Sequence, residues 1–174
     1  MQLKNTIIYL IGFSGCGKLT IANKIAKEVG GIVLDNQLIN NPIFNLAGTK
    51  SNIPPKAWYY IENIRDVVFE AAAHFAKENK CYILTNELFE REYGDNMIFR
   101  KVVELADSIN FKLIPIRLIC QEKELLKRAA SKERKKNFKM TNVEMIKEKM
   151  GKYKIYTPKT PHHTLDITKL SAQK

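Results

Sequence analysis

The sequence has few cysteines and histidines and no long apolar run. Its three cysteines, Cys16, Cys81 and Cys120, show no C-x-x-C spacing, and the three histidines do not cluster with them. This pattern argues against a disulfide framework and against a zinc site, and it is typical of reducing cytoplasm. No stretch approaches the ~20 apolar residues that a membrane-spanning helix needs. We therefore expect a cytoplasmic protein without a membrane partner.

Internal repeats, low-complexity segments and a recognisable linker are also missing. Strand-forming residues begin almost at the N-terminus, so we expect no secretory signal peptide. The 174 residues fall within the about 100–200 residues of a single domain and suffice for a full hydrophobic core. We predict one domain over residues 1–174. The sequence leaves the oligomeric state open.

Acidic residues are scarce in the C-terminal third of the chain. The formal net charge is +11, and residues 112–159 alone hold 15 Lys and Arg against 5 Asp and Glu, a difference of +10. Such a segment suits a protein that closes positive charge over a polyanion, and it would also attract RNA or DNA. A solvated helical surface explains the lysine excess equally well.

A glycine-rich motif stands between a predicted strand and a predicted helix. Residues 6–11 form an apolar strand, residues 12–18 read G-F-S-G-C-G-K, and helix-forming residues continue to 29. This is the P-loop pattern, in which backbone N–H groups converge on one anion and the lysine neutralises phosphate. Glycines are required because side chains would hold the backbone away from the phosphate oxygens or forbid positive φ. The predicted nucleotide-phosphate site consists of Gly12, Ser14, Gly15, Cys16, Gly17, Lys18, Leu19 and Thr20.

One position departs from the P-loop pattern. Leu19 stands where the pattern has Ser or Thr, whose hydroxyl normally contacts Mg²⁺. Thr20 follows it, but one residue is ~100° around a helix, so we expect Thr20 to contact the α-phosphate instead. The metal ligands therefore stay open. Mg²⁺ would depend on nucleotide oxygens, Asp35 and water, a coordination that Mg²⁺ tolerates.

Predicted strands and helices alternate along the chain. We predict strands at 6–11, 32–34, 81–85, 112–120 and 163–167, and helices at 18–29, 56–78, 95–108, 121–130 and 142–156, with a short helical or irregular segment at 38–46 broken by Pro42. Alternation implies right-handed crossovers, so the predicted fold is α/β: a parallel sheet with helices on both faces. Residues 131–141 are strongly basic and lack an apolar stripe, which predicts a mobile loop or lid.

Several segments together resemble the P-loop small-molecule kinases, the group of shikimate kinase, adenylate kinase and chloramphenicol phosphotransferase. They are the phosphate loop and residues 33–36, 58–65, 85–86 and 128–134. The chain is still more similar to bacterial AAA-type ATP-binding, nucleoside-kinase-like proteins with a G-K-L-T loop followed by D-N-x-L-I-N-N-P. The resemblance covers essentially the whole chain. It implies a five-stranded parallel sheet, ATP as phosphoryl donor and a lid that closes over the phosphates.

Asp35, directly after the second predicted strand, is the candidate catalytic base. The carboxyl ends of parallel strands form the edge where ligands of open α/β folds bind. A carboxylate there can accept the proton of an attacking hydroxyl or hold Mg²⁺ through water. The plainer alternative is that Asp35 caps a helix or pairs with a lysine or arginine.

Arg65 and Asn86 are candidates for binding the acceptor. Arg65 interrupts the apolar stripe of its predicted helix, so it either reaches an anionic group of the acceptor or extends to water. Asn86 follows the third predicted strand at the same edge as Asp35. Many P-loop proteins have a metal-anchoring carboxylate here, and in this chain Glu87 comes one residue later.

Arg128 and Arg134 are candidates on the nucleotide side. In the kinases that the chain resembles, an arginine near the end of the preceding helix packs against adenine, which implies this role for Arg128. Lid arginines there contact the transferring phosphoryl group, which implies this role for Arg134. A planar, permanently charged guanidinium suits developing charge on phosphate better than lysine does. The alternative for Arg134 is a solvated surface loop.

These features predict an ATP-dependent phosphotransferase for a small hydroxylated acceptor, such as a nucleoside, a sugar or an antibiotic-like molecule. Lys18 would bind the β- and γ-phosphates, Asp35 would activate the acceptor hydroxyl, and Arg134 would stabilise the transferring charge. Two alternatives stay open. One is a nucleotide-binding or NTP-hydrolysing protein without an acceptor, although the guanine signature N-K-x-D of many switches is missing from the sequence. The other is a kinase that acts on RNA or DNA.

Overall fold

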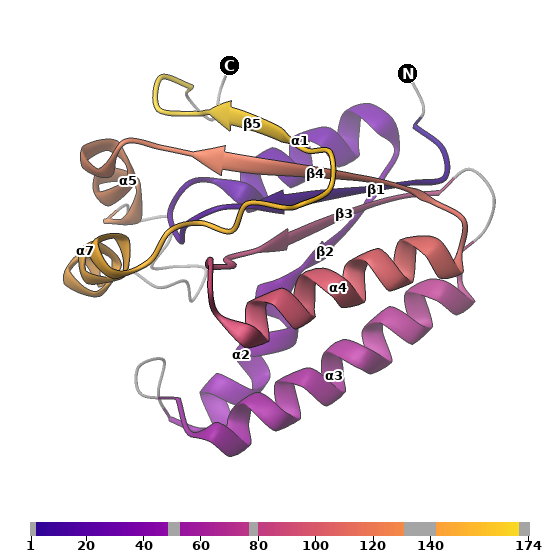
Figure 1. Ribbon diagram of the computed structural model, residues 1–174, viewed down its shortest axis with the longest axis horizontal. Coiled ribbons are helices and arrows are strands. Elements are labelled where there is room, and N and C mark those ends of the chain that lie inside the picture. Colours follow the sequence, from indigo (N-terminus) through magenta and orange to yellow (C-terminus); the bar gives the residue numbers. More distant parts are fainter. Residues whose placement is uncertain (1–2, 49–52, 77–79, 131–141, 171–174) are drawn as a thin grey trace.

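Parallel strands form the centre of the molecule (Figure 1). The computed structural model describes residues 3–48, 53–76, 80–130 and 142–170. Its strands are β1 (Thr6–Ile11), β2 (Ile32–Asp35), β3 (Cys81–Asn86), β4 (Lys112–Ile119) and β5 (His163–Asp166). They form one five-stranded sheet in the order β2-β3-β1-β4-β5, and every neighbouring pair is parallel. The predicted α/β fold is confirmed.

The two central strands are the most deeply buried part of the sheet. All six residues of β1 and all six of β3 are buried. Both strands are nearly continuous apolar runs, as parallel strands covered on both faces must be. The edge strands are more exposed, and β5 is exposed along its whole length.

Helices cover both faces of the sheet, and the alternating side chains of β1 divide between them. Ile7, Tyr9 and Ile11 face a core completed by α3 (Pro55–His74) and α4 (Tyr93–Ser108). Ile8 and Leu10 face a second core. The helices of this second face are α1 (Lys18–Val29), α5 (Glu122–Ala129) and α7 (Val143–Lys152). Figure 1 shows α3 and α4 side by side along one face.

The segment after β2 differs from its prediction. It is one helix, α2 (Asn36–Leu46), which begins two residues earlier than predicted and continues through Pro42. Asp35 starts it as an N-cap, because its side chain accepts a hydrogen bond from the backbone N–H of Gln37. Packing of α2 against α3 holds the helix together despite the proline.

The last predicted helix also ends early. We predicted it over 142–156, but α7 ends at Lys152. From there the chain pairs with the segment after β3: Ile155 forms a bridge with Phe89, and the N–H of Tyr156 donates to the carbonyl oxygen of Leu88 (2.9 Å). These pairings take over the backbone groups that a longer helix would have used.

Two further observations bear on the predictions. The predicted lid, residues 131–141, lies outside the described residues. Among the helices that the structure does describe, we find none with the length and apolar character of a membrane span.

Candidate functional site

The phosphate loop has the backbone that its glycines predict. It connects β1 to α1, with φ of 100° at Gly15 and 95° at Gly17, both in the left-handed region. At Gly12 the constraint is space, because a Cβ there would lie 2.8 Å from the Cys16 Sγ and 3.0 Å from the Leu118 carbonyl oxygen. The loop therefore brings its backbone to the carboxyl edge of the sheet, beside the N-terminus of α1.

Lys18, the first residue of α1, folds back over this loop. Its Nζ donates to the carbonyl oxygens of Gly12 (2.6 Å) and Phe13 (3.0 Å). Cys16 is buried, Leu19 is partly buried and Thr20 is exposed. The structure thus brings the predicted phosphate-site residues together in one loop and one helical turn. Their contacts with a nucleotide stay predictions.

Glu87 is a site residue to which the sequence analysis gave no role. Its Oε1 accepts a hydrogen bond from the backbone N–H of Ser14 (2.6 Å), and its Oε2 accepts one from Lys149 Nζ (3.0 Å). Burial alone would raise the pKa of this carboxyl, but the charges of Lys149 and Lys18 together with the Ser14 hydrogen bond lower the pKa below its usual value. Glu87 is therefore a carboxylate held against the phosphate loop. Only its position after β3 hinted at this.

Asp35 lies at the carboxyl edge, buried, opposite Thr85 in the β2–β3 register. Its Oδ1 accepts hydrogen bonds from Thr85 Oγ1 (2.6 Å) and from the N–H of Gln37 (3.4 Å). Asp35 is thus a helix cap, as in the plainer alternative. It also stands where a catalytic carboxylate was predicted.

Arg65 is almost fully buried, at 1% exposure, so the alternative in which it extends to water is wrong. Its Nη1 donates to Asn36 Oδ1 (2.6 Å), and its Nε donates to Glu62 Oε1 (3.3 Å). The other oxygen of Glu62 pairs with Lys101 (3.3 Å). A chain of ion pairs and one hydrogen bond therefore leads from α4 through α3 to Asn36, the residue next to Asp35.

The end of β3 connects the two sides of the site. Thr85 donates to Asp35, the carbonyl oxygen of Asn86 accepts from the N–H of Gly12 (3.2 Å), and Glu87 accepts from Ser14. Asn86 is 6% exposed and lies opposite Ile11 in the register. Three consecutive residues thus contact the candidate base and the phosphate loop.

Arg128 contacts the loop that follows β5. Its Nε pairs with Glu124 (2.9 Å), and its Nη2 donates to the carbonyl oxygens of Ile167 (3.0 Å), Thr168 (3.1 Å) and Leu170 (2.8 Å). The guanidinium therefore ties α5 to this loop, and its predicted contact with adenine stays a prediction. Arg134 lies outside the described residues.

An acidic residue near Glu87 also escaped the sequence analysis. Asp95, near the start of α4, accepts a hydrogen bond from the N–H of Phe89 (2.7 Å). Burial, with smaller contributions from Glu92 and Glu87, raises its pKa to about 6. Aspartate is common in the first turn of a helix, so the position of Asp95 in the predicted helix at 95–108 did not indicate an unusual environment.

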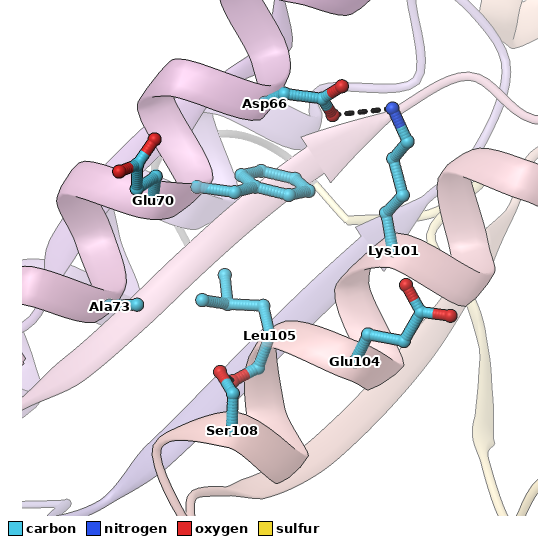
Figure 2. A pocket seen from close by; sticks show the side chains of 8 residues that line it. Asp66, Glu70, Ala73, Lys101, Glu104, Leu105 and Ser108 are labelled. Atoms are coloured by element: carbon cyan, nitrogen blue, oxygen red, sulfur yellow. Dashed lines mark hydrogen bonds and ion pairs between the residues drawn. The ribbon is translucent and has the colours of Figure 1, made fainter.

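A groove between α3 and α4 has a volume of ≈ 310 Å³ (Figure 2). Carboxylates from both helices line it, and Asp66 pairs there with Lys101. Lys101 links the groove to the site through its contact with Glu62. The groove lies on the outer surface of the helices, so we do not count it as part of the candidate site. Its lining residues are Asp66, Phe69, Glu70, Ala73, Lys101, Glu104, Leu105 and Ser108.

No protein-family model matches the chain, and a search of curated proteins finds no significant match. Solved structures do match. A gluconokinase from Sinorhizobium meliloti 1021 superposes with a TM-score of 0.62 at 13% identity, over 97% of this chain and 86% of that one. A sugar kinase from Janibacter sp. HTCC2649 gives 0.60 at 17%, over 97% and 88%. A shikimate kinase from Acinetobacter baumannii gives 0.50 at 15%, over 97% and 87%.

The chain has the fold of the P-loop small-molecule kinases. Within this P-loop kinase fold, the predicted site residues separate into two groups. The loop residues and Lys18 gather between β1 and α1, and Asp35, Arg65 and Asn86 gather around the ends of β2 and β3. Arg128 lies apart from both groups, at the loop after β5.

Proposed function

We propose that this protein is an ATP-dependent phosphotransferase that acts on a small hydroxylated acceptor. The observation that carries the proposal is the link through β3: Thr85 contacts Asp35, while Asn86 and Glu87 contact the phosphate loop. A donor site and a candidate base are thereby held at one edge of the sheet, which is what in-line phosphoryl transfer requires. The neighbours with sugar and shikimate kinase names support the same class of acceptor.

On the donor side, Lys18 and the loop N–H groups would bind the β- and γ-phosphates. Lys18 can do so by leaving the carbonyl oxygens of Gly12 and Phe13, which are weaker partners than a phosphate dianion. Arg128, which contacts the loop after β5, would pack against adenine. Arg134, in the sequence after α5, would contribute positive charge to the transferring phosphoryl group.

Mg²⁺ fits this site as a nucleotide-bound ion. The described residues hold no group of three or more potential metal ligands, and Leu19 has no ligand atom. Asp35 is a buried carboxylate at the ligand edge, and Mg²⁺ accepts one carboxylate completed by phosphate oxygens and water. When bound, the ion would neutralise charge on the transferring phosphoryl group.

On the acceptor side, Asp35 would accept the proton of the attacking hydroxyl. The hydrogen bond from Thr85 holds one carboxylate oxygen, so the other would face the acceptor. Arg65 would act through Asn36, which its guanidinium positions, and Asn86 would add an amide to the same edge. None of the three neighbours named above is described as an AAA-type protein, and we do not include that label in the proposal.

The nucleic-acid alternative has less support from the described residues. Two of the cations in the basic third are engaged within the protein, since Arg128 pairs with Glu124 and Lys149 with Glu87.

Cys16, Cys81 and Cys120 are all free thiols, which fits the cytoplasm that we propose as the location of the protein.

The test begins with Lys18→Ala, which should weaken ATP binding and abolish transfer, because phosphate charge is left without its cation. Lys27→Ala, on the exposed side of the same helix, is the matched control. Calorimetry that gives equal ATP affinity for wild type and Lys18→Ala would refute the donor site.

The acceptor needs a screen of nucleosides, sugars and oligonucleotides, with gel shifts at low and high salt beside it. Transfer to a small molecule without RNA or DNA binding supports the proposal. Transfer only to oligonucleotides, with binding that falls steeply with salt, would replace the small acceptor by a nucleic acid.

A further inference from the structure

The carboxylate of Glu87 occupies a hydrogen-bond donor of the phosphate loop. The N–H of Ser14 belongs to the glycine-rich loop that is predicted to bind phosphate, and Glu87 Oε1 accepts from it at 2.6 Å. Loop amides beside a helix N-terminus favour negative charge of any origin. Glu87 thus supplies the phosphate loop with an anion from within the protein.

The surrounding charges keep this carboxylate ionised. Its pKa is lowered by Lys149 and Lys18 in spite of its burial, so Glu87 carries its negative charge at neutral pH. A nucleotide phosphate and Glu87 would therefore place two anions on the same donors. Like charges at contact distance in a partly buried site repel strongly, so both cannot stay there.

The backbone around Glu87 is fixed, whereas its side chain has room to move. The ring of Phe89 stacks on Tyr153 (4.8 Å between centroids) and packs against Phe13 of the phosphate loop (5.6 Å). Glu90 N–H donates to the Lys154 carbonyl oxygen (2.9 Å), which fastens the same segment to the chain after α7. The Glu87 side chain itself is 17% exposed, so one side of it already borders water.

Lys149 stands beside the same anion position. Its ammonium is 3.0 Å from Glu87 Oε2 and lies over the ring of Phe89 (5.8 Å to the centroid). It comes from α7, an element that the sequence motif does not include. An anion that replaced Glu87 would find this cation already in place.

We propose that Glu87 is a competing anion for the phosphate loop, and that nucleotide phosphates displace it and take over both the Ser14 N–H and the Lys149 ammonium. This inference rests on the proposed function, since it assigns a further phosphate-binding residue, Lys149, to the same donor site. Glu87 then lowers the affinity of the loop for every polyphosphate. Only ligands with enough charge to replace the carboxylate bind well.

The experiment measures the affinity of the whole chain for ATP and for inorganic tripolyphosphate by calorimetry, without added Mg²⁺. Glu87→Gln should bind both ligands about tenfold more tightly, the order expected when one charge-assisted hydrogen bond no longer competes. Glu87→Asp keeps the charge but withdraws it by one methylene, so it should also tighten binding. Glu90→Gln, which removes a neighbouring carboxylate that contacts Thr157, should leave both affinities unchanged.

A second series tests Lys149. In the Glu87→Gln background, Lys149→Met should weaken tripolyphosphate binding about tenfold, because the lysine then serves only the ligand. Lys152→Met is the matched control on the same helix, since Lys152 lies over the ring of Tyr153 instead. An equal effect of the two lysine variants would overturn the role of Lys149.

The outcomes separate this inference from the proposed function. If wild type binds ATP and phosphorylates an acceptor, but neither Glu87 variant binds more tightly, the inference fails and the function stands. If Glu87→Gln binds tripolyphosphate more tightly and no acceptor is phosphorylated, the inference stands and the proposed function fails. Weaker ATP binding of Glu87→Gln only when Mg²⁺ is present would make Glu87 a metal anchor and overturn the competition.

Discussion

The proposed donor side of the site offers backbone N–H groups, whereas the proposed acceptor side offers buried side chains. In the phosphate loop, the positive φ of Gly15 and Gly17 and the close contact at Gly12 determine where the amides lie. Around Asp35, the position of each group depends on a hydrogen bond to a distant partner: Thr85 is 50 residues away in sequence, and Arg65 is 29 residues from Asn36.

This difference predicts how each side responds to change. A backbone site tolerates replacement of most neighbouring side chains, because its donors belong to the main chain. A side-chain network fails when one member is removed, because its partners are left buried without hydrogen bonds. The acceptor side should therefore be the more sensitive of the two.

The largest expected effect is on stability, from Arg65→Met. Removal of the buried guanidinium takes the charged donor from Asn36 Oδ1 and leaves Glu62 with Lys101 alone, which should lower the free energy of unfolding by about 3 kcal/mol. Arg100→Met is the control, since its pair with Glu104 is exposed and a surface pair contributes little. Urea unfolding measures both. Equal stability of the two variants would show that the acceptor side does not depend on its buried network.

Asp35→Asn should raise the activation free energy of phosphoryl transfer by an amount similar to the loss of stability expected for Arg65→Met. Loss of the proton acceptor should cut phosphoryl transfer about 10²-fold or more, while ATP affinity stays close to that of wild type. Asp66→Asn, in the groove between α3 and α4, is the control. A parallel loss of ATP affinity in the presence of Mg²⁺ would show that metal contact, and not proton acceptance, accounts for the effect of Asp35.

Asp95→Asn should change the pH dependence of stability by a smaller amount. Its pKa of about 6 exceeds the unfolded value of about 3.9, so the folded state binds the proton more tightly. Wild type therefore loses stability as the pH rises from about 4 to above 6. Asparagine cannot ionise and can still accept from the N–H of Phe89.

The variant should accordingly melt at a higher temperature than wild type at pH 7.5, and the difference should vanish below about pH 4. Asp107→Asn, at an exposed aspartate near the other end of α4, serves as the control. Melting curves that differ equally at both pH values would contradict the assignment.

The smallest expected effect comes from Leu19→Ser, on the donor side. A hydroxyl at this position supplies the contact with Mg²⁺ that the P-loop pattern contains, so ATP affinity or turnover should rise in a magnesium titration. Thr20→Ser, one position away, should change neither. An unchanged titration would show that the metal is organised without position 19.

The backbone of the phosphate loop could be predicted from the sequence, because it depends on a short continuous segment. The run from Gly12 to Lys18 determines its own backbone, and the alternation of strands and helices determines the sheet around it. The candidate base could be located as well, because a residue directly after a parallel strand must lie at the ligand edge.

The contacts of Glu87, Arg65 and Asp95 could not be predicted, because they join segments that are distant in the sequence. Glu87 lies 73 residues from Ser14 and 62 residues from Lys149. An arginine at position 65 could equally extend to water or contact Asn36. Only the packing of α3 determines which of the two contacts it makes. Asp95 has an unusual pKa only because the fold buries it.

The backbone from Thr85 to Glu87 determines the spacing between the candidate base and the phosphate loop. Consecutive residues of a strand advance by ~3.3 Å, so covalent geometry sets the spacing between the candidate base and the phosphate loop. Neither the acceptor nor a closing segment sets it. Under the proposed function, adaptation to larger or smaller acceptors would change α2 and α3, which carry Asn36 and Arg65, and would leave this spacing as it is.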